Sequence, residues 1–313
     1  MEALSDYLRD YRFIPVICGP TASGKSDIAM DLCRSCGGEL VSCDSMQIYR
    51  GLDIGTAKPT KEDMAQVPHH MIDIVDPDEN YSVNDYNNDA LNEIVKILRK
   101  GRLPVLCGGT GQYVSSLIKG IDYGKEQVND EIVDSLNSRF DIEGIDGIYR
   151  ELSEVDPEAA AKIHPNNTRR VIRAYAVYLS TGKTFTQKNK ESVLSGPAFP
   201  FMLFQPDIDR SVLYDRIDRR VDRMIDMGLA EEAGWLYGTY GDLKTTAFQA
   251  IGYKELRPYI NGDISLDKAV YDIKLNSRHY AKRQLTWFRT IPDIHMISPE
   301  CSTSTEQIMG SLT

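Results

Sequence analysis

The eight residues Gly19–Ser26, with the sequence GPTASGKS, constrain the fold of this chain more than any other segment. They match G-x-x-x-x-G-K-[ST], the pattern of a phosphate-binding loop. Residues 12–18 before the loop are apolar and rich in β-branched side chains, which predicts a buried strand. Residues 27–36 after it carry apolar side chains at helical spacing. Because strand, glycine-rich turn and helix follow in the order that the motif needs, we predict that a polyphosphate binds here.

Each residue type in this loop has a physical role. Glycines let successive backbone N–H groups turn inward, and the N-terminus of the next helix adds partial positive charge. Lys25 reaches a phosphate oxygen, and the hydroxyl of Ser26 can ligate Mg²⁺, the one cofactor that we expect. The predicted phosphate-binding residues are Gly19, Pro20, Thr21, Ala22, Ser23, Gly24, Lys25 and Ser26.

Other short apolar runs alternate with helical patterns. Residues 39–43, 103–107 and 201–205 are predicted strands, and residues 83–100 a predicted helix. Strands that alternate with helices favour a parallel sheet. We therefore predict an α/β fold with a parallel-sheet core like that of the P-loop NTPases.

Residues 121–198 differ from this pattern because they contain helical periodicity and no clear strand. We predict a mostly helical insertion domain there, and a catalytic core formed by residues 1–120 and 199–313. The helices expected in the insertion are residues 130–140, 148–155 and 168–181, and those expected after it are residues 210–227 and 266–290.

The charge distribution leaves two interpretations open. The formal net charge is −10, which by itself argues against a nucleic-acid partner. Residues 165–190, however, hold six basic side chains and no acid, and residues 273–289 hold five and no acid. These windows are typical of a basic groove on an acidic body, or equally of two solvated helix faces.

Composition excludes several classes of protein. No stretch approaches the ~18 apolar residues of a membrane span, and charges interrupt the first thirteen residues, unlike a secretory signal. The six cysteines include one C-x-x-C, Cys33 and Cys36, without the second pair that a zinc site needs. We therefore expect free thiols and a cytoplasmic protein that does not enter membranes.

Three further residue groups bear on the chemistry. Asp44 directly follows a predicted strand, where it could act as a general base, orient a magnesium ligand or cap the next helix. The strand at 103–107 ends in Gly-Gly-Thr-Gly and lacks the Asp with which an NTPase holds Mg²⁺. Thr110 in that turn could contact a phosphate, position a substrate or serve only the turn. His69 and His70 face opposite ways on a strand, which favours structural hydrogen bonds over a shared metal.

Seven motifs in order along residues 14–290 resemble the tRNA dimethylallyltransferase family, also called the tRNA isopentenylpyrophosphate transferases. They are GPTASGKS, DSMQIYRGLDIGTAKP, PHHMIDIVDP, GGTGQYV, NNTRRVIRAYAVYLSTGK, AIGYKE and AKRQLTWFR. The phosphate loop alone would not be specific, but seven ordered motifs are.

The resemblance implies transfer of a dimethylallyl group from dimethylallyl diphosphate to N6 of the adenine on the 3′ side of a tRNA anticodon. It implies a P-loop core and a helical insertion that grip the anticodon stem-loop, with the target base flipped into a channel. By motif position, the implied catalytic residues are Asp44 as the base, Thr110, and Arg220 among the arginines of RIDRRVDR. We expect a monomer.

The resemblance also implies contacts to tRNA at three motifs. Phe248, Gln249 and Tyr253 have side chains suited to stacking and edge hydrogen bonds, although packing at a helix start explains them as well. The implied tRNA-binding residues are Asp44, Ser45, Met46, Gln47, Thr110, Arg169, Arg170, Val171, Ile172, Arg173, Phe248, Gln249, Ala250, Ile251, Gly252 and Tyr253.

This sequence departs from the family in one stretch. Near residue 133 the family often has a tRNA-contacting arginine in a D-P-x-x-R-like segment, and here the residues are VNDEIVD, so no residue is carried over. No zinc-finger extension follows the last motif, which fits a bacterial-type enzyme.

Three other functions remain possible from the sequence. An adenylate dimethylallyltransferase would use a free nucleotide as acceptor, and would not need the two basic windows or the insertion. A P-loop small-molecule kinase would need the magnesium-binding Asp that is not found. A non-catalytic RNA-binding module would give the phosphate loop and Asp44 no role.

Overall fold

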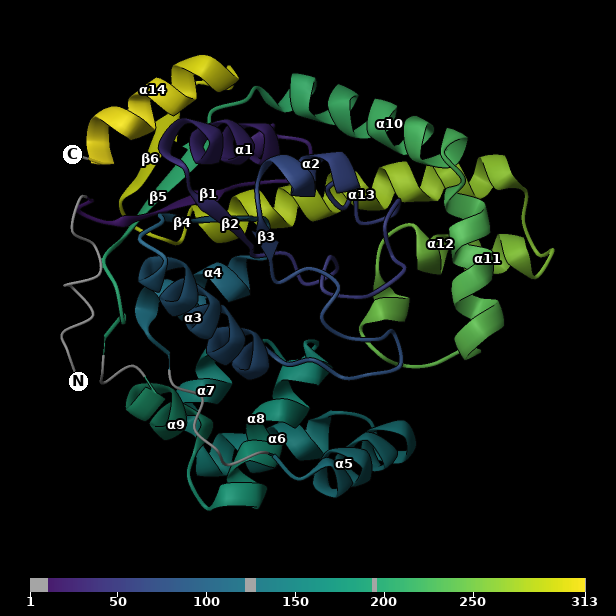
Figure 1. The fold of residues 1–313 in the computed structure, drawn as a ribbon. Helices are drawn as coiled ribbons and strands as arrows, with labels where there is room; N and C mark the ends of the chain where they lie inside the picture. The colour runs from purple at the N-terminus through teal and green to yellow at the C-terminus, as the bar shows by residue number, and fades with distance from the viewer. Residues whose placement is uncertain (1–10, 122–127, 193–195, 313) are drawn as a thin grey trace. The chain divides into compact units, whose positions relative to one another are not determined.

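The structure, a computed structural model, describes residues 11–121, 128–192 and 196–312 (Figure 1). The chain divides into two compact units. The first comprises Met1–Ile118 together with Ala198–Thr313, and the second comprises Lys119–Pro197.

The first unit is built on a parallel sheet of six strands, which confirms the predicted α/β fold. The strand order is β3-β2-β4-β1-β5-β6. The strands are β1 (Ile14–Cys18), β2 (Glu39–Ser42), β3 (His69–His70), β4 (Pro104–Gly108), β5 (Phe201–Pro206) and β6 (Ile294–Ile297). All residues of β1 and β4 are buried, as the uninterrupted apolar runs predict for the centre of a parallel sheet.

Helices cover both faces of this sheet (Figure 1). On one face, α1 (Lys25–Cys36) and α14 (Cys301–Leu312) pack through apolar side chains such as Ile28 and Ile308. On the other face lie α3 (Val83–Arg99), α4 (Gly111–Lys119) and the end of α13 (Leu266–Phe288). There the rings of Tyr86 and Tyr113 stack with their centroids 3.8 Å apart.

A third apolar cluster lies beyond the sheet and fixes the segment that follows β2. The segment contributes Ile48, Tyr49 and Leu52, all fully buried. The remaining elements of this unit are α2 (Lys61–Gln66), α10 (Arg210–Asp226), α11 (Leu229–Tyr240), the 3₁₀ helix η2 (Ala247–Gln249) and α12 (Tyr253–Ile260). Because α11 and α12 bury their apolar faces against this segment, it has a defined path although it has no regular secondary structure.

The second unit is helical in its described residues. Its helices are α5 (Asp130–Glu143), α6 (Asp146–Val155), α7 (Pro157–Lys162), α8 (Thr168–Thr181) and α9 (Phe185–Ser192). Its own core includes Leu152 and Val171, both fully buried. In neither unit does a described helix have the length and apolar character that crossing a membrane requires.

A buried carboxylate at the start of β2 connects this strand to β3 and to the segment before β4. The side chain of Glu39, at the start of β2, is 2% exposed and pairs with His70 at 2.7 Å, Lys100 at 2.9 Å and Arg102 at 3.0 Å. His70 also contacts Glu93 of α3 at 2.8 Å, so it makes the structural hydrogen bonds that the sequence favours. These pairs lower the pKa of Glu39: burial raises it, but hydrogen bonds from Lys100 and His70 outweigh burial.

Replacing this carboxylate by an amide tests its contribution. We expect Glu39→Gln to lower the free energy of unfolding by about 2 kcal/mol at neutral pH, because half-exposed Lys100 and Arg102 can be rehydrated. A lowered folded pKa stabilises above the ordinary value of 4.5, and this stabilisation is lost as pH falls through the folded pKa. The difference between the two proteins in urea titrations should therefore shrink below about pH 4.5. Glu62→Gln, at an exposed residue, is the control, and a difference that persists in acid would contradict this account.

Candidate active site

A cavity of about 1160 Å³ lies in the first unit, where β1, β2 and β4 end. Ligands of open parallel sheets bind at this edge. Its walls come from the phosphate loop, the turn after β2, α10, α13 and residues 249–252. Residues far apart in the sequence thus meet in one cavity.

The phosphate loop has the geometry that its glycines predict. Gly19 and Gly24 have φ angles of +137° and +88°, and Gly24 forms the N-cap of α1. Lys25 donates from Nζ to the carbonyl oxygen of Pro20 at 3.1 Å, so its ammonium lies over the loop. Of the eight predicted residues, Thr21–Ser26 line the cavity, whereas Gly19 and Pro20 are buried behind it. The hydroxyl of Ser23 is also buried and has no hydrogen-bond partner among the residues that the structure describes.

The cavity concentrates positive charge with few counter-charges. Burial lowers the pKa of Lys25, and the nearby guanidinium of Arg220 lowers it further. Burial likewise lowers the pKa of Arg220, although the carboxylate of Asp44 partly opposes this. Keeping two buried cations charged close to each other costs free energy. A bound polyanion would offset this cost, so the cavity favours a polyanionic ligand.

Arg220 is distinguished from its neighbours by its burial. The side chains of Arg216, Arg219 and Arg223 also line the cavity but are exposed, and Arg219 is paired with Asp215 at 2.8 Å. Arg220 is partly buried and takes part in no ion pair among the residues that the structure describes. It is therefore the arginine of α10 best placed to contact a bound anion.

Asp44 and Thr110 come together where β2 and β4 end. Asp44 accepts a hydrogen bond at Oδ1 from the backbone N–H of Met46 at 2.9 Å, which forms a tight turn. The hydroxyl of Thr110 accepts from the backbone N–H of Ser45 at 3.0 Å and lies 3.2 Å from the Ser45 hydroxyl. Thr110 thus holds the Asp44 turn in place.

Two residues of α13 that the sequence analysis missed belong to the cavity. Burial and the negative charge of Asp44 raise the pKa of Tyr280 to about 12, so it stays a neutral hydroxyl. Gln284 is 5% exposed and contacts both the phosphate loop and the turn after β4. Gln284 lies within the motif AKRQLTWFR and Tyr280 directly precedes it, but the motif alone does not show which of its side chains enter the cavity.

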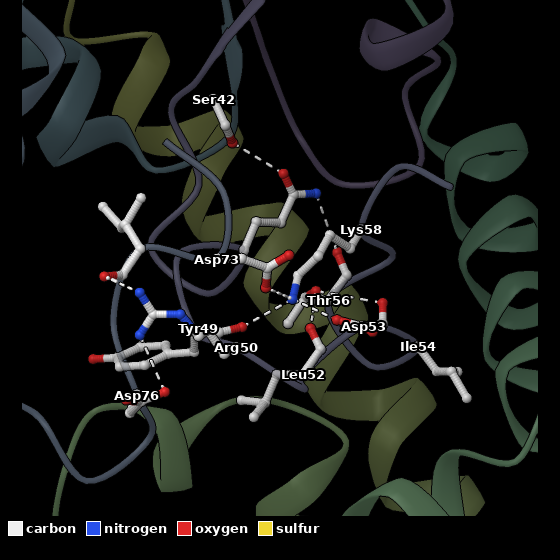
Figure 2. A network of polar contacts seen from close by, with 12 residues as sticks. Ser42, Tyr49, Arg50, Leu52, Asp53, Ile54, Thr56, Lys58, Asp73 and Asp76 are labelled. Atoms are coloured by element: carbon white, nitrogen blue, oxygen red, sulfur yellow. Dashed lines mark hydrogen bonds and ion pairs between the residues drawn. The ribbon is translucent and has the colours of Figure 1, made fainter. Parts of the chain in front are cut away.

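A buried ammonium organises the segment between Asp44 and Pro59, and Figure 2 shows its contacts. The side chain of Lys58 is 3% exposed and donates to the carbonyl oxygen of Tyr49 at 2.9 Å. It also donates to the carboxylates of Asp53 and Asp73, the latter at 2.6 Å. Because two carboxylates and a carbonyl surround one cation, the segment closes on itself.

Gln47 lies inside the same network. Its side-chain oxygen accepts from the hydroxyl of Ser42 at 2.9 Å, and its nitrogen donates to the carbonyl oxygens of Thr56 and Ala57 (Figure 2). The amide therefore already has partners within the protein. Gln47 also lines the cavity, where its predicted contact with tRNA stays a prediction.

Glu232 of α11 holds the same segment from outside. Its carboxylate accepts the backbone N–H groups of Asp53, Ile54 and Gly55 at 2.9–3.0 Å, and the hydroxyl of Tyr253 at 2.6 Å. Three successive N–H groups around one anion make a nest. Gly55 has no room for a side chain, since a Cβ there would lie 2.6 Å from the Tyr253 ring.

This contact corrects part of the predicted tRNA interface. Tyr253 is fully buried and Phe248 is 2% exposed, with its ring 5.4 Å from that of Tyr237. Rings enclosed by protein cannot stack on a base, so their packing role is the one observed. Gln249 is exposed and lines the cavity, together with Ala250, Ile251 and Gly252.

The structure shows which cations of the two basic windows have partners. In the second, Arg278 binds Asp218 at 2.6 Å and Lys274 binds Asp222, so α10 neutralises two of the five basic side chains of this window. In the first, Val171 and Ile172 are buried in the core of the second unit. Lys183 and Lys190 of that window are exposed but paired with Glu191 and Glu158. Its exposed arginines, Arg169, Arg170 and Arg173, form no ion pair in the described parts of the chain.

The cavity offers few protein side chains that could bind a metal ion. Within residues 11–121, 128–192 and 196–312, no three His, Cys, Asp or Glu side chains gather as a metal site. The hydroxyl of Ser26 is exposed in the cavity. All six cysteines are free thiols.

Several known proteins are similar to this chain over most of its length. A curated tRNA dimethylallyltransferase of Acetivibrio thermocellus is 43% identical over 95% of both chains, and that of Bacillus subtilis 45% identical over 88% of this chain and 87% of its own. The crystal structure of the tRNA isopentenylpyrophosphate transferase of Bacillus halodurans is 40% identical, covers 96% of both chains and has a TM-score of 0.70. The structure of a eukaryotic dimethylallyltransferase acting on tRNA has a TM-score of 0.82 at 30% identity, covering 95% of this chain and 77% of its own.

The family assignment rests on a match to most of the chain. The model of the family described as IPP transferase matches residues 47–291, which include the Lys58 network, Thr110, Arg220 and Gln284. The chain belongs to the IPP transferase family.

Proposed function

We propose that this chain is a tRNA dimethylallyltransferase. It transfers a dimethylallyl group from dimethylallyl diphosphate to N6 of the adenine on the 3′ side of the anticodon, and releases diphosphate. The observation that carries the proposal is that one cavity contains two cations suited to a polyanion, Lys25 and Arg220, together with the carboxylate of Asp44. The similar proteins named as tRNA dimethylallyltransferases support it.

Asp44 supplies the base that this reaction needs. The exocyclic amine of adenine is a weak nucleophile because its lone pair is delocalised into the ring. As N6 bonds to C1 of the dimethylallyl group, the C1–O bond breaks and its electron pair leaves with the diphosphate. The N6 proton passes to the carboxylate of Asp44. Thr110 holds the turn that aims this carboxylate.

The cations stabilise the leaving group. Lys25, Arg220 and the N–H groups at the start of α1 face the charge that develops on diphosphate. Mg²⁺ fits a site with one protein hydroxyl, because it keeps several waters and binds mostly through substrate phosphates. Ser26 would hold it, and the ion would neutralise phosphate charge.

The acceptor tRNA would meet several surfaces. Gln249 and the Asp44–Gln47 turn lie at the cavity, where a flipped adenine would enter. Arg169, Arg170 and Arg173 of the second unit offer exposed positive charge for phosphates. In this proposal the anticodon stem-loop is the partner, and the enzyme acts in the cytoplasm as a monomer.

A kinase is disfavoured by the geometry after β4. A Cβ on Gly108 would lie 2.2 Å from the carbonyl oxygen of Cys43, so no side chain fits there. The magnesium-binding Asp of a P-loop kinase therefore has no place at the end of this strand.

Transfer of label from dimethylallyl diphosphate tests the function. With Mg²⁺ present, we expect label in bulk tRNA, recovered as N6-dimethylallyladenosine, and none in AMP or ATP offered in parallel. Label in free nucleotide alone would favour an adenylate dimethylallyltransferase. No label in any acceptor would refute prenyl transfer.

Removing the proposed base should slow the chemical step. Asp44→Asn keeps an oxygen for the Met46 N–H but cannot take a proton, so single-turnover transfer should fall by about 10²–10⁴-fold. Affinities for diphosphate and tRNA, measured by titration, should change little. An unchanged rate would rule out Asp44 as the base.

Removing the loop cation should weaken donor binding. Lys25→Ala loses a charged hydrogen bond to phosphate, so the Kd for inorganic diphosphate in calorimetry should rise by about 10- to 100-fold. The Kd for tRNA serves as the control and should stay within about two-fold. Equal diphosphate affinity in both proteins would be incompatible with this reading of the loop.

Neutralising two arginines of α8 should reduce the salt dependence of tRNA binding. Because each phosphate contact contributes about 0.7–0.9 to the slope of log K against log salt, Arg169→Gln with Arg170→Gln should lower the slope by about 1–2. The matched control is Lys162→Gln with Lys190→Gln, which removes equal charge from lysines already bound to Glu158. Equal slopes in the two double variants would place the tRNA elsewhere.

A further inference from the structure

Gln284 uses both ends of its side-chain amide to join two loops. Its Oε1 accepts the backbone N–H of Thr21 in the phosphate loop at 2.9 Å. Its Nε2 donates to the carbonyl oxygen of Gly109, after β4, also at 2.9 Å. Gln284 is 5% exposed, and its bond to Gly109 is buried while its bond to Thr21 is partly buried.

The two loops lead to opposite sides of the proposed reaction. Thr21 lies four residues before Lys25, in the loop that would hold diphosphate. Gly109 precedes Thr110, whose hydroxyl holds Ser45 and with it the Asp44 turn. A continuous path of bonds therefore runs from the phosphate loop through Gln284 to the proposed base.

Gly109 is shaped for this contact. A Cβ at that position would lie 2.2 Å from Nε2 of Gln284 and 3.1 Å from the carbonyl oxygen of Gly19. Because no side chain fits between them, the amide reaches the backbone directly.

The helix that carries Gln284 is fixed on both sides of it. Arg278 binds Asp218 of α10 at 2.6 Å, and Trp287 donates from Nε1 to the hydroxyl of Ser115 at 3.0 Å. Ala281 of α13 is fully buried and packs with Ala22 of the phosphate loop and Leu213 of α10. A side chain held on a rigid helix can set the spacing of the loops that it bridges.

We propose that Gln284 is a positioning residue that sets the phosphate loop against the Asp44–Thr110 turn. This inference rests on the proposed function. Among side chains of this length, only an uncharged amide supplies both the acceptor for Thr21 and the donor for Gly109. A residue that only filled space could be replaced by methionine, which has similar length and no hydrogen-bonding amide.

Gln284→Met is the test, and Thr286→Ala on the exposed face of the same helix is the control. Transfer should be followed as a single turnover, with donor and tRNA saturating. We expect the rate constant of Gln284→Met to fall by about 10- to 100-fold, because small displacements of reacting groups are costly. The tRNA affinity should stay within about two-fold, and the control should match the wild type.

The amplitude and the rate constant of the single turnover distinguish a positioning role from a folding defect. A variant that is partly unfolded loses amplitude in a single turnover, while its folded molecules react at the wild-type rate constant. A lower rate constant at full amplitude therefore supports positioning. A wild-type rate constant, at whatever amplitude, would overturn it.

Two further measurements keep the inference testable. If Gln284→Met does not fold, Gln284→Asn replaces it, because its amide is one methylene too short to reach both loops; the same fall in rate constant is expected. Inorganic diphosphate should bind Gln284→Met about 3- to 10-fold more weakly than the control. This binding needs no tRNA, so it tests the bridge even if the wild type transfers no dimethylallyl group, a result that would refute only the proposed function. Equal diphosphate affinity would overturn the inference.

Discussion

The arrangement of the site depends on the position of β4 between β1 and β2. Parallel pairing on both sides places the phosphate loop after β1, the Asp44 turn after β2 and the glycine turn after β4 at one edge of the sheet. Gly108 permits this, because its backbone approaches Cys43 so closely that no side chain fits. A cationic loop and a carboxylate then share one cavity, as prenyl transfer to an amine requires.

The irregular segment after β2 is held by ions rather than by secondary structure. The ammonium of Lys58 closes it from within, and the carboxylate of Glu232 binds its backbone N–H groups from α11. Both charges are matched by several partners, which offsets the cost of burying them. The segment can therefore present the Asp44 turn without being part of a helix or strand.

The sequence predicted what local patterns determine, and missed what long-range packing determines. The phosphate loop and the strands β1, β2, β4 and β5 follow from motif and apolar runs, whereas β3 has two residues and β6 lies at the sheet edge with half its residues exposed. The aromatic rings of Phe248 and Tyr253 suggested stacking on a base, and only the folded chain shows them buried. Gln284 lies in the motif AKRQLTWFR, but its bridging role could not be predicted, because its partners lie 263 and 175 residues away in the sequence.

We propose that one cavity holds the diphosphate on the cations and directs the reacting carbon toward the carboxylate. A crystal structure with the donor analogue in which sulfur replaces the bridging oxygen tests this most directly, because the analogue resists cleavage. We expect its diphosphate to contact Lys25 and Arg220, and its C1 carbon to lie on the side of Asp44. Diphosphate bound outside the loop, or C1 directed away from Asp44, would contradict it.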